Sequence, residues 1–259
     1  MTSKTTSKFF ITHLYPKELS IYGDQGNILA LCNALKQIGW EYEYQQVNIG
    51  SKMPDQTDFL FIGGGQDRDQ SKIVDDLFGR KKQLTKLINE GCAMLAICGG
   101  YQLFGKEFID SRGEIMTGLD VFPVITRSPD AEIKSRCIGN LVIESNLTNS
   151  TLIGFENHGG QTYFTQEATP LGTVLSGFGN NFKDKHEGCV YKNAIGTYLH
   201  GSCLPKNPEL AQWLINAVLE TKKSKGQISL ATYHDLKNSK WKTDIALQAK
   251  NDLIKRLLG

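Results

Sequence analysis

Apolar runs alternate with amphipathic segments through the first 110 residues of the chain. The runs predicted to be strands are either continuously apolar or alternate in period two, and they cover 9–15, 41–47, 58–62 and 92–97. Two segments carry apolar residues at helical spacing, 28–38 and about 71–90. Because helices that join parallel strands pack on the faces of the sheet, this alternation predicts a doubly wound, mainly parallel α/β sheet.

The pattern changes after residue 110, where short strands dominate. The predicted strands are 121–126, 141–144, 172–175, 188–191 and 194–199. A helix is predicted over 207–220, followed by an exposed linker at 222–226 and a charged amphipathic helix over 242–258. The last helix could pack on the domain or contact a partner. We therefore predict one domain over 9–221 and an extension over 222–259 that comprises a linker and the C-terminal helix.

Composition and charge narrow the class of protein. With 40% hydrophobic and 22% charged residues and a net charge of +2, the chain has no basic excess that would favour nucleic acid or an anionic membrane. Its six cysteines lack a disulfide-framework spacing. Residues 1–8 are polar, are expected to fray, and contain no secretory signal. These features predict a cytoplasmic protein that does not insert into the membrane.

Cys98 has the strongest chemical signature in the chain. It ends an apolar strand and is followed by Gly99 and Gly100 and then by a helical pattern. A strand that turns sharply into a helix presents a nucleophile at the carboxyl end of a sheet, beside backbone N–H groups that can stabilise an oxyanion. A buried core cysteine next to a loop glycine is the structural alternative.

A second glycine-rich strand end lies at 63–65, so its backbone amides are expected at the same edge of the sheet as Cys98. The segment could instead bind a nucleotide phosphate, but it lacks the Lys-Ser/Thr pair of a P-loop and the GxGxxG spacing.

A cysteine nucleophile needs a base, and His200 also follows an apolar strand and precedes a glycine. His158, in a polar glycine turn, is the second candidate. A zinc site is a competing interpretation, because His200 and Cys203 have zinc-like local spacing, as do His186 and Cys189. Against it, Cys189 lies in an apolar hairpin.

Five segments, in this order and spacing, resemble class I glutamine amidotransferases of the cobyric-acid-synthase-like branch. Residues 98–102 (Cys-Gly-Gly-Tyr-Gln) and 196–201 (Gly-Thr-Tyr-Leu-His-Gly) resemble the branch as a whole. Residues 22–27, 61–68 and 154–160 resemble, more narrowly, the glutaminase subunits of lipid II isoglutaminyl synthases. The matching region runs from about residue 11 to 205.

The resemblance implies a glutaminase. Cys98 would attack the side-chain amide carbon of L-glutamine to form a γ-glutamyl thioester, with His200 as general base and then general acid. The N–H groups of Gly64 or Gly65, together with that of Gly99, would hold the oxyanion.

The resemblance also implies substrate-binding side chains. Gln102, in the cysteine motif, is expected to contact the substrate. An arginine before a strand would bind glutamine; Arg136 matches that place, Arg127 is its rival, and a surface arginine is the structural alternative. A guanidinium can grip the α-carboxylate through two hydrogen bonds.

One position departs from the wider class I pattern, in which a glutamate two residues after the histidine orients the imidazole. Here that position is Ser202. Because a serine cannot stabilise an imidazolium as a carboxylate does, we expect the third member of the triad to come from elsewhere in the chain or from a partner.

No ATP-binding signature is present, so this chain is expected to bind no cofactor. The resemblance implies a Mur-ligase-like partner that uses ATP and Mg²⁺ and amidates D-glutamate in the lipid II stem peptide to D-isoglutamine. Other possibilities are an amidotransferase for another acceptor such as a cobyrinate, a stand-alone peptidase or γ-glutamyl hydrolase, and a catalytically silent partner-binding module.

Overall fold

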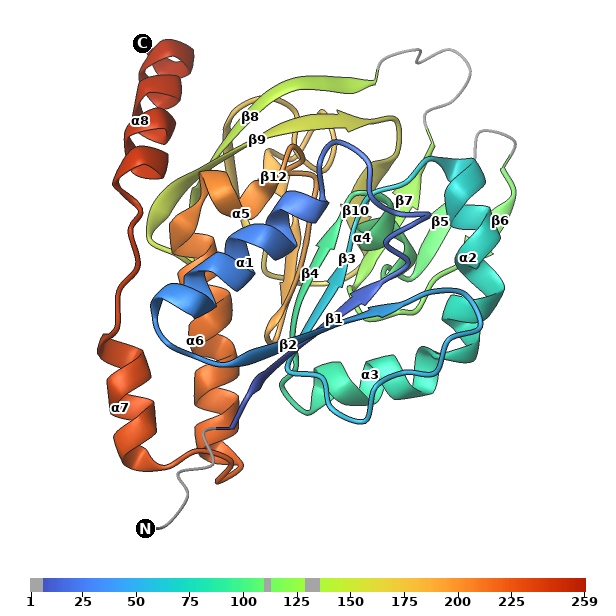
Figure 1. The fold of residues 1–259 in the computed structure, drawn as a ribbon. Helices are drawn as coiled ribbons and strands as arrows, with labels where there is room; N and C mark the ends of the chain where they lie inside the picture. Colours follow the sequence, from blue (N-terminus) through green and yellow to red (C-terminus); the bar gives the residue numbers. More distant parts are fainter. Residues whose placement is uncertain (1–6, 110–112, 129–135) are drawn as a thin grey trace.

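The computed structural model describes residues 7–109, 113–128 and 136–259 and centres on a six-stranded sheet (Figure 1). The strand order is β13-β14-β4-β3-β1-β2, and only the β13–β14 pair is antiparallel. The strands are β1 (Phe9–Leu14), β2 (Tyr42–Val47), β3 (Phe59–Ile62), β4 (Ala93–Ile97), β13 (Cys189–Tyr191) and β14 (Ala194–Thr197). The predicted doubly wound, mainly parallel sheet is confirmed. The polar tail at 1–6 lies outside the described residues.

Helices cover both faces of this sheet, as the continuously apolar central strands require. Every residue of β3, β4 and β14 is buried. In Figure 1, α1 and α6 lie on one side of the sheet and α2 and α3 on the other. The helices are α1 (Gln25–Gln37), α2 (Asp67–Gly79), α3 (Lys81–Asn89), α4 (Gly99–Leu103), α5 (Cys203–Lys206) and α6 (Pro208–Ser224).

The single helix predicted over about 71–90 is wrong, because two helices occupy this stretch. The first begins at Asp67 and ends at Gly79, and the second begins after Arg80. Arg80 is held in place by a short ion pair, 2.7 Å from its Nε to Asp76 Oδ2, and Asp76 also accepts a hydrogen bond from the Tyr15 hydroxyl. The break changes the direction of the chain between α2 and α3. Each of the two helices still has an apolar face that packs on the sheet.

The later strands form two further sheets that the periodicity did not separate. One has the order β10-β7-β5-β6 and the other β12-β11-β8-β9. Their strands are β5 (Glu107–Ile109), β6 (Ile115–Thr117), β7 (Val124–Arg127), β8 (Cys137–Ser145), β9 (Ser150–His158), β10 (Gln161–Phe164), β11 (Gly172–Ser176) and β12 (His186–Glu187). The strand predicted at 121–126 begins only at Val124. Residues at the end of β9 and directly after β7 line the candidate site described below.

The C-terminal region packs against the domain. The exposed linker predicted at 222–226 is wrong at its start, because α6 continues to Ser224 and Lys222 is buried, with its Nζ 2.8 Å from Asp58 Oδ2. A helix that was not predicted, α7 (Leu230–Asn238), follows, and α8 (Asp244–Leu258) matches the predicted last helix. Among the described residues, no helix combines the length and apolar character that crossing a membrane requires.

Candidate active site

Three neighbouring parallel strands, β3, β4 and β14, end at the same edge of the central sheet, and each is followed by one of the predicted chemical motifs. Cys98 follows β4 directly and has a left-handed backbone, with φ 49° and ψ −105°. A non-glycine residue in such a conformation costs about 1–3 kcal/mol and typically marks a functional site. The Cys98 N–H donates to the Thr197 carbonyl at 2.8 Å, which fixes the turn against β14. The predicted nucleophile turn is therefore present in the structure.

His200 comes off the end of β14 and lies beside Cys98. Its backbone N–H donates to the Phe155 carbonyl at 2.8 Å, and its ring meets the Tyr22 ring edge-on with centroids 5.0 Å apart. A methyl group built on Gly64 would lie 2.9 Å from His200 Cε1 and 3.3 Å from Cys98 Cβ. The glycine-rich loop, Cys98 and His200 thus meet at one point.

The imidazole of His200 is poised as a neutral base. Burial lowers the pKa of His200 to about 3, and the nearby charges of His158 and Lys206 act in the same direction. Within the described residues neither ring nitrogen has a hydrogen-bond partner. One nitrogen is therefore available to the thiol, and no carboxylate of the described chain orients the other.

Ser202, two residues after His200, does not orient the imidazole and instead connects two loops. Its Oγ donates to the Gly23 carbonyl at 2.5 Å, so it ties the loop that carries His200 to the segment before α1. That the third member of the triad comes from elsewhere in the chain or from a partner stays a prediction.

The backbone N–H groups of the glycine loop at 63–65 are not all free to bind an oxyanion. The Gly64 N–H already donates to Asp24 Oδ2 at 2.7 Å, whereas the N–H groups of Gly65 and Gly99 donate to no other group of the described chain. Of the candidate oxyanion donors, Gly65 and Gly99 are therefore the two that the structure leaves available. Gly64 serves the site through close packing, because any Cβ at this position would press on His200.

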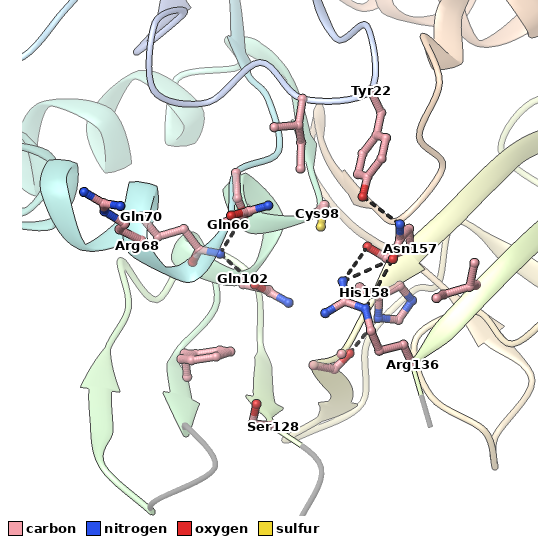
Figure 2. A pocket seen from close by; sticks show the side chains of 16 residues that line it. Tyr22, Gln66, Arg68, Gln70, Cys98, Gln102, Ser128, Arg136, Asn157 and His158 are labelled. Carbon is pink, nitrogen blue, oxygen red and sulfur yellow. Dashed lines mark hydrogen bonds between the residues drawn. The ribbon is translucent and has the colours of Figure 1, made fainter. Parts of the chain in front are cut away.

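A cavity of about 590 Å³ opens in front of Cys98 (Figure 2). It is lined on one side by Gln66, Arg68 and Gln70 of the β3–α2 region, and on the other by Arg136 and by the polar turn after β9. This volume is sufficient for a small amino acid.

Arg136 lies in the cavity, whereas its rival Arg127 is not among the residues that line it. The guanidinium of Arg136 donates from Nη2 to Asn157 Oδ1 at 3.1 Å, with further contacts from Nε and Nη2 to the same residue, and it remains exposed (Figure 2). Residues 134 and 135, which precede it in the predicted motif, lie outside the described residues.

Gln102 is buried, and both ends of its amide are engaged by protein. Its Oε1 accepts from Gln70 Nε2 at 3.2 Å, and its Nε2 donates to the Tyr198 hydroxyl at 3.1 Å. Gln70 also donates to the Gly65 carbonyl at 3.2 Å. A chain of hydrogen bonds therefore runs across the cavity floor from the glycine loop to Tyr198.

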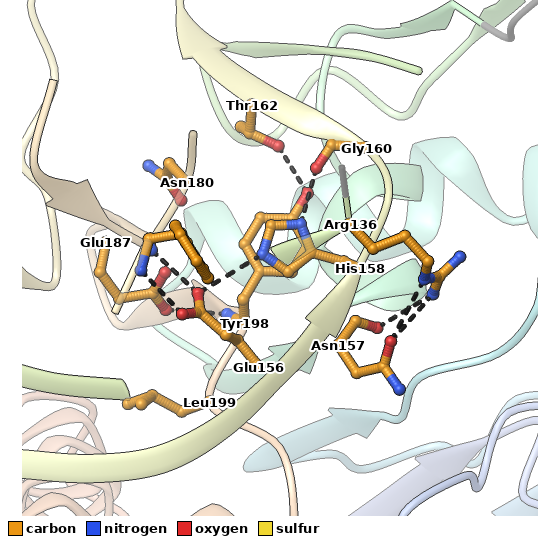
Figure 3. A network of polar contacts seen from close by, with 12 residues as sticks. Arg136, Glu156, Asn157, His158, Gly160, Thr162, Asn180, Glu187, Tyr198 and Leu199 are labelled. Carbon is orange, nitrogen blue, oxygen red and sulfur yellow. Dashed lines mark hydrogen bonds and ion pairs between the residues drawn. The ribbon is translucent and has the colours of Figure 1, made fainter. Parts of the chain in front are cut away.

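A buried polar network supports the strand end that leads to His200 (Figure 3). His158 stacks on the Tyr198 ring with centroids 3.6 Å apart, and its Nδ1 donates to the Gly160 carbonyl at 2.7 Å. Behind it, Glu187 accepts from the Tyr198 N–H at 2.8 Å and from the Thr197 hydroxyl. Burial raises the pKa of Glu187 to about 7. These contacts fix the wall of the cavity.

Sequence reasoning missed several residues that the fold brings to the site. The sequence alone leaves open whether Asp24, in the 22–27 segment, touches the substrate, and Tyr22 of the same segment lines the cavity. Gln70 and Glu187 carry no local signal, because a single polar residue on a helix or at a strand end is common. The competing zinc interpretation gains no support: the described residues contain no cluster of three or more His, Cys, Asp or Glu side chains arranged to hold a metal.

Comparison with known families agrees with this geometry. Residues 10–208 match the model of the CobB/CobQ-like glutamine amidotransferase domain. The chain is 41% identical over 213 residues to the GatD subunit of lipid II isoglutaminyl synthase (glutamine-hydrolyzing) of Staphylococcus aureus, covering 82% of this chain and 85% of that protein. It is 38% identical over 228 residues to the GatD subunit of Streptococcus pneumoniae, covering 87% and 86%.

More distant similarities extend to other members of the fold. A probable cobyric acid synthase of Methanococcus vannielii is 36% identical over 157 residues, which cover 57% of this chain but only 30% of that protein. Among solved structures, PurLQS from Thermotoga maritima matches with a TM-score of 0.54 and 15% identity, covering 82% of this chain and 98% of the matched chain, and so supports the fold alone. This chain belongs to the CobB/CobQ-like glutamine amidotransferase family and, within it, groups with the GatD-type subunits.

Proposed function

We propose that this chain is the glutaminase subunit of a lipid II isoglutaminyl synthase. The observation that carries the proposal is the convergence of Cys98, His200 and the glycine loop at one cavity, in a chain about 40% identical to GatD subunits over most of its length. The printed name of those relatives specifies a glutamine-hydrolysing enzyme that acts on lipid II.

The first half-reaction forms a thioester. His200 accepts the thiol proton of Cys98 while the sulfur attacks the side-chain carboxamide carbon of L-glutamine. The negative charge moves to the carboxamide oxygen, which the N–H groups of Gly65 and Gly99 stabilise. His200 then donates its proton to the amide nitrogen, and the C–N bond breaks. Ammonia departs, and a γ-glutamyl thioester remains on Cys98.

The second half-reaction hydrolyses the thioester and regenerates the free enzyme. His200 removes a proton from water, hydroxide adds to the thioester carbonyl, and the C–S bond breaks. The sulfur takes the proton back from His200, and glutamate departs. Because burial holds the pKa of His200 well below neutrality, the imidazole is a neutral base at the start of each step.

Arg136 would hold the α-carboxylate of glutamine. Its position in the cavity, with an exposed guanidinium that is hydrogen-bonded to Asn157, supports this role. A guanidinium fits a carboxylate through two parallel hydrogen bonds. Gln102, whose amide is already paired with Gln70 and Tyr198, shapes the cavity floor beneath the substrate.

The ammonia would be used by a Mur-ligase-like partner that activates the D-glutamate carboxyl group of the lipid II stem peptide with ATP and Mg²⁺. In this scheme the present chain needs no cofactor of its own and works in the cytoplasm beside the membrane-bound substrate. A partner also offers a source for the carboxylate that His200 lacks within the described chain.

The test is glutamate release from L-glutamine by the purified chain and by Cys98→Ala, each with and without the Mur-ligase-like partner. The proposal expects release that depends on Cys98 and rises when the partner is added. Equal release from Cys98→Ala, or none under any condition, would reject it. Release from γ-glutamyl peptides in preference to free glutamine would favour a stand-alone hydrolase.

A further inference from the structure

The segment that precedes α1 packs directly on the glycine loop, and the reaction steps above give it no role. Asp24 at its end is fully buried. Its Oδ2 accepts the Gly64 N–H at 2.7 Å, and its Oδ1 is buried with no hydrogen-bond partner within the described residues. The Gly64 carbonyl in turn accepts the Ile21 N–H at 3.3 Å. One turn of chain therefore holds both polar groups of Gly64.

The glycine loop requires these hydrogen bonds, because the backbone of three consecutive glycines has little steric preference for one conformation. A peptide in the loop could rotate with little resistance if its N–H and carbonyl groups were not bonded. The space on the Asp24 side is filled, since a Cβ on Gly63 would lie 2.9 Å from Asp24 Oδ2 and 2.3 Å from the Leu19 carbonyl oxygen. The Asp24 carboxyl group thus packs tightly against the backbone of the glycine loop.

The two bonds to Gly64 also set the direction of the next amide. In a trans peptide the carbonyl and the N–H point in opposite directions. Because the Gly64 carbonyl is held toward Ile21, the Gly65 N–H of the same peptide points away from Ile21. Gly65 and Cys98 both line the cavity.

The holding segment is itself anchored to the histidine side of the site. Ser202 Oγ donates to the Gly23 carbonyl, and Asn27 Oδ1 accepts the Leu204 N–H at 2.8 Å. The loop that carries His200 and the loop that offers the oxyanion amides are therefore connected through the residues on either side of Asp24.

We propose that Asp24 is a positioning residue that orients the 64–65 peptide, so that the Gly65 N–H faces the carbonyl oxygen of the substrate at Cys98. It touches neither substrate nor thiol and acts through the backbone. The inference rests on the proposed glutaminase function and extends it to the residue that builds the oxyanion site.

The test compares Asp24→Ala and Asp24→Asn with the wild-type full chain, alone and with its partner. Two readouts are taken: kcat and KM for L-glutamine, and the rate at which iodoacetamide alkylates Cys98. Alkylation needs a reactive thiol and His200 but no oxyanion site. The matched control is Asp58→Asn, since Asp58 Oδ2 also accepts a backbone N–H, from Phe10 at 2.8 Å, at the opposite end of β1 and β3.

Losing an oxyanion donor lowers kcat by about 10²–10³-fold in other hydrolases. We expect Asp24→Ala to lower kcat by about 100-fold, with KM and the alkylation rate within about threefold of wild type. Asp24→Asn keeps an acceptor of the same shape but cannot carry charge, so its kcat should fall by about 10-fold. Asp58→Asn should keep kcat within about twofold, because it is remote from the chemistry.

An Asp24→Ala chain that hydrolyses glutamine at the wild-type rate would overturn the inference, and so would equal losses of hydrolysis and alkylation in Asp24→Asn. Both results leave the proposed function standing, because the wild type remains active. A wild-type chain that hydrolyses no glutamine, with or without its partner, would overturn the proposed function itself.

Discussion

Replacing Gly64 with alanine adds one methyl group where the glycine loop comes closest to the catalytic pair. The new Cβ would lie 2.9 Å from His200 Cε1 and 3.3 Å from Cys98 Cβ. Because carbon atoms in ordinary contact are about 3.5–4.0 Å apart, the His200 ring or the loop must move by about 0.6 Å or more. His200 has little room to retreat, because it is fully buried and the Tyr22 ring meets it edge-on with the ring centroids 5.0 Å apart.

The displacement acts on reaction geometry more than on stability. A misplacement of about 1 Å in a catalytic group can cost about 100-fold in rate. We therefore expect Gly64→Ala to lower kcat for glutamine hydrolysis by about 10- to 100-fold. KM should change by less than about threefold, because Arg136, the residue proposed to hold the α-carboxylate of glutamine, lines a different part of the cavity (Figure 2).

The assay measures glutamate release at several glutamine concentrations, together with thermal unfolding. Gly79→Ala is the matched control, since a Cβ at Gly79, the last residue of α2, has no heavy atom within 4 Å. That control should keep wild-type kcat. Unchanged kcat in Gly64→Ala would contradict the close approach of the glycine loop to His200.

Three further predictions concern substrate binding, stability and pH. Arg136→Lys should raise KM for glutamine by about 10-fold with little change in kcat, because an ammonium cannot grip a carboxylate bidentately; an unchanged KM would contradict the assignment. Lys222→Met should lower the free energy of unfolding by about 2 kcal/mol in urea titrations, because it removes the buried cation that pairs with the half-buried Asp58 carboxylate, while Cys98 alkylation stays at the wild-type rate; a loss below about 0.5 kcal/mol would show that this ion pair contributes little to stability. Burial raises the pKa of Glu187 to about 7, above that of the unfolded chain, so its contribution to stability is full below the unfolded pKa and is lost as pH rises through about 7. Glu187→Gln should accordingly show a smaller fall in Tm between about pH 5 and pH 8 than wild type, and identical slopes would refute the shift.

The sequence was most informative where a local pattern has one physical explanation. A continuously apolar strand that ends in Cys98, Gly99 and Gly100 favours a buried strand that turns into a helix over a core cysteine beside a loop, and the structure has the strand–turn–helix form. The same holds for β3 and its glycines. Periodicity alone was therefore enough to predict the central sheet and the edge at which the site lies.

Prediction failed where tertiary contacts decide the outcome. Nothing in the pattern at 222–226 distinguishes a solvated lysine run from a helix end in which Lys222 reaches a half-buried aspartate 164 positions earlier in the chain. The helix break at Arg80 was signalled by Gly79, but it is fixed by an ion pair with Asp76 whose second contact, Tyr15, is distant in sequence.

In the candidate site, too, some residues could be predicted from local sequence and others could not. Cys98 and His200 each end an apolar strand and could be proposed locally. Asp24, at the start of α1, could not be given a role, because its importance comes from a contact with Gly64, which is 40 positions away in the loop after β3. Supporting residues of this kind have no local signature and emerge only when the fold brings their strands together.

The most direct test of thioester formation at Cys98 is the intact mass of the chain after brief mixing with L-glutamine and an acid quench. We expect a covalent adduct with the mass of glutamine minus ammonia, located on the peptide that contains Cys98 and absent from Cys98→Ala. Glutamate release that continues in Cys98→Ala, with no adduct on the wild-type chain, would contradict it.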